Sequence, residues 1–576
     1  MNSSSAASAP PLRLWPGVLL IGLTWGARFG LPSEVPELLY LGVATALLSG
    51  PLLALWWVGL SRAPRAERWM VPGAALGAMA LCYPLLHASL ATGMQRLMYP
   101  LFAFPTVGAA VVAWAAWGRR AGGRARWLLL GLLLAVGAGG WTAVRTGGFT
   151  GDLDHDFAWR WASTPEERLV AQGEAAGVRA QAAPEAQPSP EAAIAWPGFR
   201  GPLRDGVLRG WSASDDWESQ PPVEVWRRAV GPGWSSFAVQ GECAYTQEQR
   251  GEEEWVSCYA LADGSLLWSH ADPVRFWESN AGAGPRGTPS LRDGALYALG
   301  ATGVLNALDA RTGESVWSRD VAADSGEPVP EWGFSASPLV SEELVVVAAA
   351  GVLLAYERSD GSLRWQGESG RGGYSSPQLT QLAGEEQLVF VDSEGVSGRQ
   401  LDDGALLWSH AWSGDPIVQP TPVGASDLLI SVSARGGMRR LSIERGESGW
   451  SARELWTTIR LKPYFNDLVV HDGHAYGFDG GILACVSLED GARSWKGGRY
   501  GHGQLLLLPD CERLLVLGEA GELVLVEAGA DAFHELARVQ ALEGKTWNHP
   551  VLVDDLVLVR NAEEMAAYRL PALEDA

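Results

Sequence analysis

The chain contains few cysteines and lacks the common motifs of hydrolases, nucleotide-binding enzymes and zinc enzymes. Five Cys occur in 576 residues, far below the density of a disulfide-stapled scaffold. No G-x-S-x-G, Walker or H-E-x-x-H motif is present, so these enzyme classes have no support. We interpret HDGH (471–474) as a hairpin turn, because zinc needs three or four ligands. The motifs therefore predict no metal site.

Lysine is missing from the first 150 residues, and charge is spread unevenly along the chain. Residues 1–150 contain 11 Arg and 3 Glu, a net charge of +8, whereas the remainder has a net charge of −30. A nucleic-acid surface needs clustered Lys and Arg to bind phosphate. The acidic remainder therefore argues against nucleic acid as a partner and predicts a solvated surface.

Five stretches without charge occupy most of residues 14–145. Each is close to the roughly 20 residues that a bilayer requires. They are 14–27, 38–61, 69–95, 97–118 and 127–144. The sequence therefore predicts a transmembrane anchor of about five helices over residues 1–150, with the lipid bilayer as one partner.

The loops between these stretches predict the orientation of the anchor. Two of the loops are rich in Arg, and they contain Arg62, Arg65, Arg68, Arg119, Arg120, Arg124 and Arg126. The positive-inside rule places both loops in the cytoplasm. We therefore expect a multi-pass protein of the inner membrane, with its N-terminus in the cytoplasm and everything after Trp141 outside. His87, alone inside a span, is interpreted as a packed residue.

Residues 151–195 are predicted to connect the anchor to the rest of the chain. Asp152, Asp154 and Asp156 alternate here, and we interpret them as an acidic segment in water in preference to a cation site. A short helix is expected over 164–181, with Thr164 as N-cap and Glu167 completing a capping box. The Ala- and Pro-rich AAPEAQPSPEAA that follows is typical of a spacer.

One phrase recurs between Trp226 and Trp495, namely an apolar run, an acidic turn ending in Gly, and a strand with Trp. It occurs as YALADGSLLW (259–268), NALDARTGESVW (306–317), AYERSDGSLRW (355–365), RQLDDGALLW (399–408) and VSLEDGARSW (486–495). The Trp residues of this series are Trp226, Trp268, Trp317, Trp365, Trp408, Trp456 and Trp495, at intervals of 39–49 residues. Such a period predicts a β-propeller.

We predict eight blades of four strands in residues 196–576, with seven as the alternative because repeat five (RLSIERGESGWSARELW) is irregular. Each turn Gly joins a third to a fourth strand, and each Trp is expected to wedge between blades. The last repeat (NHPVLVDDLVLVRNAEEMAAYRLPA) has only three strands. VEVWRRAV (223–230) is predicted to supply the fourth strand and so close the ring.

Polar side chains at the starts of the innermost strands are predicted to converge on the mouth of the central channel, where a ligand would bind. They are Arg286, Ser337, Tyr374, Ser376, Gln419, Asn466, His502, Gln504, Lys545, Asn548 and His549. The alternative is that these groups satisfy one another and ordered water.

Two cysteines flank a predicted hairpin. If its turn is centred between Arg250 and Gly251, Cys243 faces Cys258 across two strands. A disulfide between the two is then one alternative, since cross-strand neighbours are close enough and the compartment is oxidising.

The repeated A-L-D-x-x-T-G-x-x-x-W phrase resembles the pyrroloquinoline-quinone (PQQ) repeat of quinoprotein dehydrogenases and of the outer-membrane assembly lipoprotein. AWPGFRGPLRDGV (195–207) is similar to the opening of large bacterial PQQ-like propeller proteins. This resemblance covers about 196–571 and implies an eight-bladed propeller. Five helices before a propeller also resemble membrane-bound quinoprotein glucose dehydrogenase, which implies PQQ with Ca²⁺ as a cofactor. The chain has no Cys-Cys pair and no match to the family's Ca²⁺ ligands or catalytic Asp.

The preferred hypothesis is a membrane-anchored propeller that binds an envelope protein, or a small ligand, outside the cytoplasm without catalysing a reaction. The first alternative is a PQQ-dependent dehydrogenase that passes electrons to membrane quinone, with the channel-mouth residues holding the cofactor. A second alternative is a sensor that transmits ligand binding to the helices.

Overall fold

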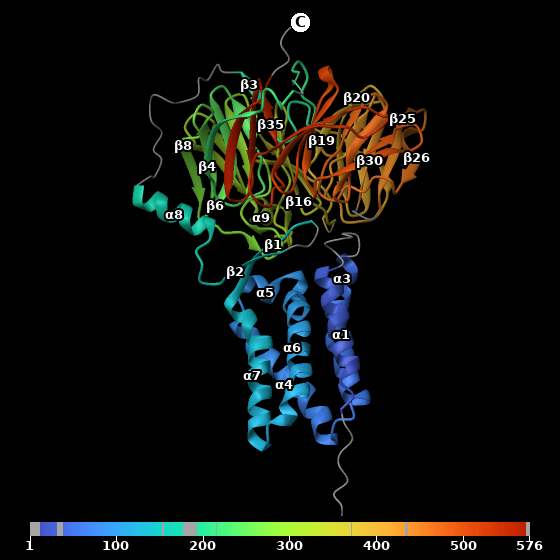
Figure 1. Ribbon diagram of the computed structural model, residues 1–576. Coiled ribbons are helices and arrows are strands. Elements are labelled where there is room, and N and C mark those ends of the chain that lie inside the picture. Colours follow the sequence, from blue (N-terminus) through green and yellow to red (C-terminus); the bar gives the residue numbers. More distant parts are fainter. Residues whose placement is uncertain are drawn as a thin grey trace, which may run out of the picture. The chain divides into compact units, whose positions relative to one another are not determined.

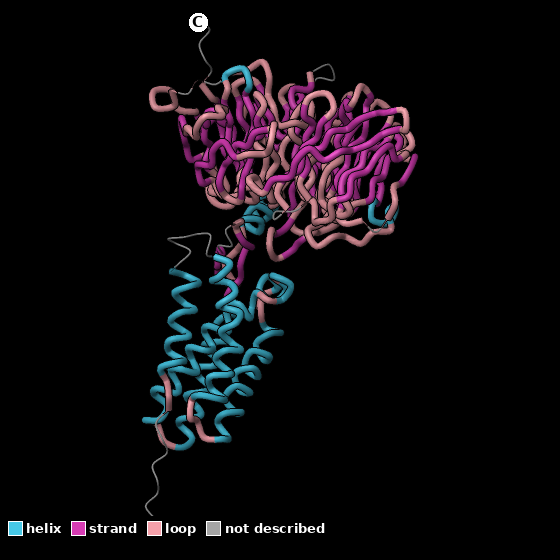
Figure 2. Tube along the Cα trace, turned by 90° about the vertical axis from the view of Figure 1, so that its right-hand side faces the viewer, coloured by secondary structure: helices cyan, strands magenta, loops and turns pink. Residues whose placement is uncertain are grey.

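The chain is divided into a helical unit and a propeller unit. A computed structural model describes residues 12–30, 39–151, 155–176, 193–212, 214, 216–369, 371–432 and 436–571. The helical unit comprises residues 1–162 with 278–282, and the propeller unit comprises 163–277 with 283–576. Figure 2 shows the first as helices and the second as strands.

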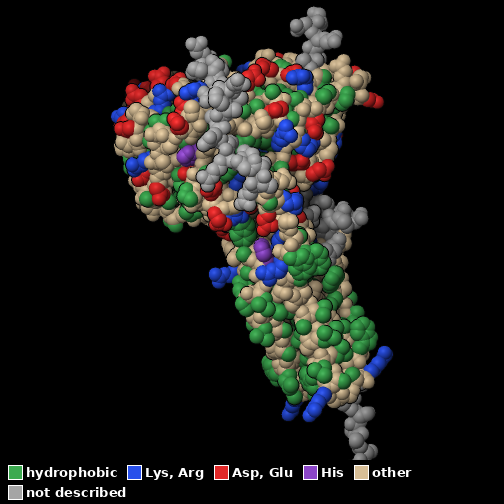
Figure 3. All heavy atoms as spheres, turned by 90° about the vertical axis from the view of Figure 1, so that its left-hand side faces the viewer, with side chains coloured by type: hydrophobic (Ala, Val, Ile, Leu, Met, Phe, Trp, Pro, Cys, Tyr) green, Lys and Arg blue, Asp and Glu red, His purple; other side chains and the backbone are tan. Residues whose placement is uncertain are grey.

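The helical unit is built from apolar helices that run alongside one another (Figure 1). The main helices are α1 (Trp15–Trp25), α3 (Leu39–Leu55), α4 (Arg65–Cys82), α5 (Ala88–Thr92), α6 (Met98–Trp117) and α7 (Gly123–Gly139). Short π and 3-10 turns extend them, namely η1 (Gly26–Gly30), η3 (Trp56–Leu60), η4 (Tyr83–Leu85), η5 (Met94–Arg96), η6 (Gly118–Arg120) and η7 (Gly140–Ala143). Hydrophobic side chains gather over the surface of this unit in Figure 3.

Three helical segments of the described chain are long and apolar enough to cross a membrane, not the five that we predicted. They are Leu41–Leu60, Met98–Trp117 and Gly123–Ala143. Helix α1 has only 11 residues, and α4 has Arg65, Glu67 and Arg68 in its first turn.

The predicted span 69–95 is not one helix. Helix α4 ends at Cys82, and η4 and the short α5 follow. Pro84 lies at the start of η4, and the ring of His87 accepts a hydrogen bond from the backbone N–H of Ser89 as the N-cap of α5. A proline and a new cap interrupt the helix here, although hydropathy continues unbroken.

A β-hairpin follows the helices in the same unit, with strands β1 (Val144–Phe149) and β2 (His155–Trp159). Asp156 Oδ1 accepts hydrogen bonds from the Gly147 N–H at 2.7 Å and the Thr146 hydroxyl at 3.2 Å. Asp156 therefore stabilises the hairpin. Asp152 and Asp154 lie outside the described residues.

Helix α8 (Pro165–Ala176) begins the propeller unit with the predicted capping box. The Thr164 N–H donates to Glu167 Oε2 at 2.7 Å, and the Glu167 N–H donates to Thr164 Oγ1 at 2.9 Å. Residues 177–192, with the predicted end of this helix and most of the spacer, lie outside the described residues.

The propeller has eight blades, which confirms the prediction of eight over seven. Blade 1 consists of β5 (Ala238–Gln240), β6 (Cys243–Arg250), β7 (Glu253–Ala260) and β8 (Leu266–Asp272), and blade 2 of β11 (Ser290–Arg292), β12 (Ala295–Leu299), β13 (Val304–Asp309) and β14 (Ser315–Asp320). Blade 3 consists of β15 (Leu339–Val340), β16 (Leu344–Ala349), β17 (Val352–Glu357) and β18 (Leu363–Gln366), and blade 4 of β19 (Gln378–Leu382), β20 (Glu385–Asp392), β21 (Gly395–Arg399) and β22 (Leu406–Ala411).

Blade 5 consists of β23 (Thr421–Val423), β24 (Asp427–Ile430), β25 (Met438–Gly446) and β26 (Gly449–Thr458), and blade 6 of β27 (Val469–His471), β28 (His474–Asp479), β29 (Ile482–Ser487) and β30 (Arg493–Arg499). Blade 7 consists of β31 (Gln504–Leu508), β32 (Arg513–Leu517), β33 (Glu522–Glu527) and β34 (Glu535–Gln540), and blade 8 of β35 (Val551–Val553), β36 (Leu556–Arg560), β37 (Glu564–Arg569) and β4 (Val223–Ala229). The remaining elements are β3 (Ile194–Trp196), which joins blade 1, with β9 (Trp277–Glu278), β10 (Gly282–Ala283), α9 (Val321–Ser325) and η8 (Pro509–Cys511).

The repeat Trp residues wedge between blades, as predicted. Most of these indole N–H groups donate to a backbone carbonyl in the next blade, as Trp317 does to Arg358 at 3.0 Å. The same indole packs on Gly361, in the turn between the third and fourth strands of that blade. Gly361 has φ of +72°, and a Cβ built on it would lie 2.7 Å from the Trp317 ring. The repeated Gly is therefore required both by its backbone and by the neighbouring indole.

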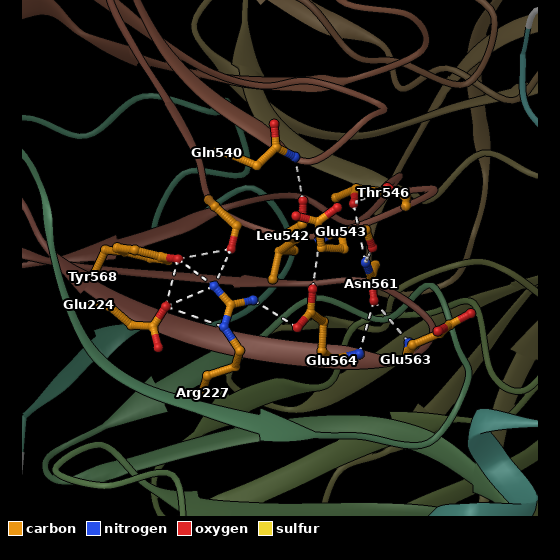
Figure 4. Close-up of polar contacts among 12 residues, drawn as sticks. Glu224, Arg227, Gln540, Leu542, Glu543, Thr546, Asn561, Glu563, Glu564 and Tyr568 are labelled. Atoms are coloured by element: carbon orange, nitrogen blue, oxygen red, sulfur yellow. Dashed lines mark hydrogen bonds and ion pairs between the residues drawn. The ribbon is translucent and has the colours of Figure 1, made fainter.

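Strand β4 completes blade 8 and closes the ring, as predicted. Arg227 on this strand donates to Glu564 at 2.7 Å, to Glu224 at 2.8 Å and to the Tyr568 hydroxyl at 2.6 Å (Figure 4). It also reaches the Ala541 carbonyl at 2.8 Å. One guanidinium thus links the closing strand to blades 7 and 8.

Candidate functional site: the central channel and its mouth

Residues 196–208 cross the central channel, and we call this segment the plug. Its backbone or side chains bond to the innermost strands of several blades, or to the residues just before them. The Leu291 N–H donates to the Pro197 carbonyl, the Gln378 side chain to the Leu203 carbonyl, and the Leu507 N–H to the Gly206 carbonyl. These three contacts lie in blades 2, 4 and 7. The plug consists of the WPGFRGPLRDGV phrase of the sequence followed by Leu208, and it occupies space that a ligand would need.

Two arginines fix the plug in the channel. Arg204 donates to the carbonyls of Ser337 at 3.1 Å and Pro338 at 2.9 Å. Arg200 is 3% exposed and donates to the Leu468 carbonyl at 2.7 Å. Its Nε lies 3.7 Å from Asp467 Oδ2. The plug is thus held by charge-assisted bonds in a setting of low dielectric.

His549 and Asp467 contact the plug from blades 8 and 6. The His549 ring lies 5.0 Å from that of Phe199, edge to face, and its Nε2 lies 3.7 Å from Asp467 Oδ2. Burial, with Arg200 nearby, lowers the pKa of His549 to about 3. Burial also raises the pKa of Asp467, although Arg200 opposes this. His549 is therefore neutral at physiological pH and serves as a packing surface.

Most of the predicted channel residues link one blade to the next around the ring. Ser337 Oγ accepts from the Thr288 N–H, Ser376 Oγ from the Ser337 N–H, and Gln419 Oε1 from the Ser376 N–H. Asn466 donates to the Gly503 carbonyl, Gln504 to that of Trp547, and Asn548 to that of Ser235. These bonds agree with the alternative that the polar groups satisfy one another.

Aromatic side chains gather at the end of the channel where the innermost strands begin, and we call this set the aromatic mouth. Its members are half-buried and precede the innermost strands of five blades: Trp234, Trp332, Tyr374, Phe465 and Trp547. The Trp547 ring lies 4.7 Å from that of Trp234 and 4.8 Å from that of Phe465. The rings of Trp332 and Tyr374 lie 5.0 Å apart. Sequence reasoning found Tyr374 but missed the other four, which immediately precede or lie near the polar residues that it chose.

The other predicted residues are part of this mouth. Lys545 Nζ lies 4.5 Å from the centre of the Trp547 ring, a cation–π geometry. The His502 N–H donates to Glu519 Oε2 at 2.9 Å, and Glu519 Oε1 accepts from the Trp547 indole at 2.7 Å. Arg286 donates to the Trp332 carbonyl at 3.3 Å. Half-buried rings with a cation and hydrogen-bonding groups can bind a peptide or a small apolar ligand.

The predicted pairing of Cys243 with Cys258 is wrong by two residues. Cys243 faces Ala260, and Cys258 faces Tyr245. The loop consists of Gly251, which has φ of +58°, and Glu252. The turn is therefore centred one residue later than predicted, and this shifts every cross-strand partner by two residues. The two cysteines are diagonal neighbours and both are free thiols here, so a disulfide stays a prediction.

The channel residues do not fit a PQQ and Ca²⁺ pocket. The described residues hold no group of three or more His, Cys, Asp or Glu side chains placed to bind a metal ion. Asp467 is the carboxylate beside the plug, and it already faces Arg200 at 3.7 Å and receives the Gln419 N–H at 3.0 Å. The amides of Asn466 and Asn548 bond to backbone carbonyls.

Away from the channel, a cavity of about 360 Å³ lies between α8 and the ring-closing strand β4. It is lined by Pro165, Arg168, Leu169, Gln172, Arg227, Arg228, Ala229, Glu543, Glu563 and Glu564. Helix α8 is fixed beside it, since Glu166 accepts two hydrogen bonds from Arg275, at 2.6 and 2.9 Å. The lining has charges of both signs, so it favours no single class of ligand.

Comparison with known proteins shows that the propeller is similar to proteins named as outer membrane assembly factors and, in fold, to a quinoprotein dehydrogenase. A family model described as outer membrane protein assembly factor BamB matches residues 252–497. A protein of that name from Yersinia pestis is 23% identical over 367 residues, which cover 59% of this chain and 86% of the relative. The structure of BamB from Moraxella catarrhalis has a TM-score of 0.46 at 16% identity, and covers 62% of this chain and 99% of its own. A quinohemoprotein alcohol dehydrogenase from Pseudomonas putida HK5 has a TM-score of 0.44 at 13% identity, over 67% of this chain and 81% of its own.

Proposed function

We propose that this chain, whose propeller belongs to the PQQ-like propeller family, is a binding scaffold for a protein of the cell envelope. Its relatives are named as factors of outer membrane protein assembly, so assembly of envelope proteins is the process in which we place this chain. A rigid ring with many exposed loops is suited to docking, although the fold alone grants no activity.

The aromatic mouth is the observation that carries the proposal. Tyr and Trp provide large contact areas at low conformational cost and are enriched where proteins bind proteins. The rings of Trp234 and Trp547 lie 4.7 Å apart, and Lys545 adds a cation beside them. The plug lies behind this mouth, so a partner would bind on the surface and not thread through the ring.

We further propose that the helical unit anchors the chain in the inner membrane, with the propeller outside the cytoplasm. Three segments have the length and composition of spans. The Arg-rich loops then set the orientation by the positive-inside rule.

Site-directed photo-crosslinking of the full chain in its native membrane tests this proposal. A benzophenone amino acid replaces Tyr374 at the mouth, and a matched control replaces Leu406, which is 55% exposed on the outer strand of the same blade. We expect a discrete adduct with an envelope protein, identified by mass spectrometry, from position 374 and none from position 406.

Two results would contradict the proposal. The first is an adduct from position 406 with none from 374. The second is saturable, stoichiometric uptake of PQQ with Ca²⁺ by the purified full chain, detected by quinone absorbance and lost in His502→Ala with Asn548→Ala. That uptake would favour the dehydrogenase alternative.

A further inference from the structure

Three cationic side chains gather around one buried carboxylate on the edge of blade 6, and we call them the Asp479 cluster. Lys462 Nζ lies 2.7 Å from Asp479 Oδ1, Arg493 Nη2 lies 2.7 Å from Oδ2, and Lys496 Nζ lies 2.8 Å from Oδ2. Arg493 also donates to the backbone carbonyl of the exposed residue Arg460.

The cluster has a charge opposite in sign to the net charge of the acidic part of the chain. Residues after 150 have a net charge of −30, whereas the cluster sets three cations against one carboxylate. The chain has only three lysines, Lys462, Lys496 and Lys545, and two of them lie here. A cationic patch on an otherwise acidic surface directs an anionic group to that patch, because the acidic surroundings repel it and charge complementarity fixes its position.

Asp479 holds the cluster in a fixed geometry. Its side chain is 1% exposed, and although burial alone would raise its pKa, Lys462 and Lys496 hold the pKa below its usual value. The ionised carboxylate therefore orders three long side chains that would otherwise lose conformational entropy on binding. The side chains of Lys462, Lys496 and Arg493 remain 37%, 28% and 26% exposed, so their outer N–H groups can donate to a ligand.

An apolar contact adjoins the cluster. Ile459 is 65% exposed and its backbone carbonyl accepts from Lys462 Nζ at 3.4 Å. Leu455, on the preceding outer strand β26, is 38% exposed. A peptide with acidic and aliphatic side chains would match both features, whereas a free phosphate would use only the cations.

We propose that the Asp479 cluster binds an acidic segment of the partner protein. This inference rests on the proposed scaffold function and adds a second contact, on the outer side of the ring, to the aromatic mouth. The acidic segment would pair its carboxylates with Lys462, Lys496 and Arg493, and its aliphatic residues would cover Ile459.

Binding of a fluorescein-labelled octaglutamate peptide to the full chain in detergent micelles tests the inference by fluorescence anisotropy. We expect binding at low salt (about 50 mM) that weakens at high salt, because exposed charges are then screened. K462Q with K496Q removes two of the three cations, and we expect about tenfold weaker binding, since rim charges act through complementarity and not burial. Octalysine should not bind at this site.

R453Q with R569Q is the matched control. Each of these arginines is 61% exposed and paired with one carboxylate, so the pair removes the same charge away from the cluster. We expect binding within twofold of the unmodified chain. An equal loss in both double variants, at unchanged thermal stability, would overturn the inference because net charge would then explain it.

The D479N variant tests whether the peptide binds because Asp479 orders the cations or only because the site is positively charged. The variant gains one positive charge, so a simple charge effect predicts tighter binding, whereas loss of the central carboxylate frees the three cations and predicts weaker binding. Tighter binding would overturn the inference. So would displacement of the peptide by equimolar inorganic phosphate, or loss of phosphatidylglycerol vesicle binding in K462Q with K496Q while peptide binding is unchanged.

Failure of this inference and failure of the proposed function are distinguishable. If octaglutamate does not bind the unmodified chain but position 374 still crosslinks to an envelope protein, the cluster is excluded and the scaffold stands. If position 374 gives no adduct, the scaffold fails whatever the peptide does.

Discussion

Blade 5 meets blade 4 differently from the way blade 3 meets blade 2. In the regular interface, the Trp317 indole donates to the Arg358 carbonyl and packs on Gly361 in the next blade. Trp408, at the edge of blade 4, instead donates to Gln387 Oε1 within its own blade, at 2.7 Å. Blade 5 has the long hairpin β25–β26 in place of the short turn with Gly. Trp408 is nevertheless 3% exposed. Burial of the indole is thus common to both interfaces, while its hydrogen-bond partner is replaceable.

Substitution of the turn Gly should distinguish these two interfaces most strongly. Gly361→Val places a branched side chain at φ of +72° and against the Trp317 ring, so we expect a loss of about 4 kcal/mol from backbone strain and overpacking together. Gly446→Ala, in the blade 5 hairpin, meets only the Gly449 carbonyl at 4.0 Å, and it should change little. Urea unfolding of the full chain followed by tryptophan fluorescence measures both. Similar losses of unfolding free energy in both variants would show that the short turn and its neighbouring indole do not specifically require Gly.

A pH titration sharpens the comparison at another regular interface, between blades 1 and 2. Burial, with Asp272 opposite it in the strand pair, raises the pKa of Glu254 to about 7. The folded state then binds this proton more tightly than the unfolded state, so stability should fall by about 3 kcal/mol as pH rises from 4.5 to 7.

Glu254→Gln should flatten this pH dependence, whereas Glu253→Gln, at the exposed neighbouring position, should leave it unchanged. Thermal unfolding across that pH range measures the slope. An unchanged slope in Glu254→Gln would mean that another group is responsible.

The smallest effect is expected at the irregular interface itself. Gln387→Leu removes the partner of the Trp408 indole, and both side chains are buried. An unpaired buried N–H costs about 2 kcal/mol. Gln381→Leu, on the exposed side of the adjacent strand β19, serves as control. If both variants unfold at the same urea concentration, the indole has found a different partner.

Periodic features were predictable from the sequence because each recurs. The repeated Trp and turn Gly identified eight blades and the wedge, and the unpaired last repeat identified Val223–Ala229 as the closing strand. The register of β6–β7 was missed because Gly251 can occupy either position of a two-residue loop, and the two choices differ by two residues in every cross-strand pair.

The sequence did not predict that the plug, residues 196–208, crosses the central channel. Its contacts run mainly to backbone carbonyls, as those of Arg204 do, and carbonyls leave no trace in side-chain patterns. The site was predicted in part: the strand starts were correctly located, but their polar residues mainly join blades. The half-buried aromatic residues beside them form the mouth, and an isolated Trp in a propeller reads first as core.

The plug and strand β4 precede every blade that they bind, apart from the small strand β3. During synthesis on the ribosome they emerge before the blades, yet β4 pairs with β37, the last of the described strands. The ring therefore stays open until β37 has been synthesised, and until then β4 has an unpaired edge. A chaperone that shields this edge would govern the yield of closed rings more than the stability of any blade.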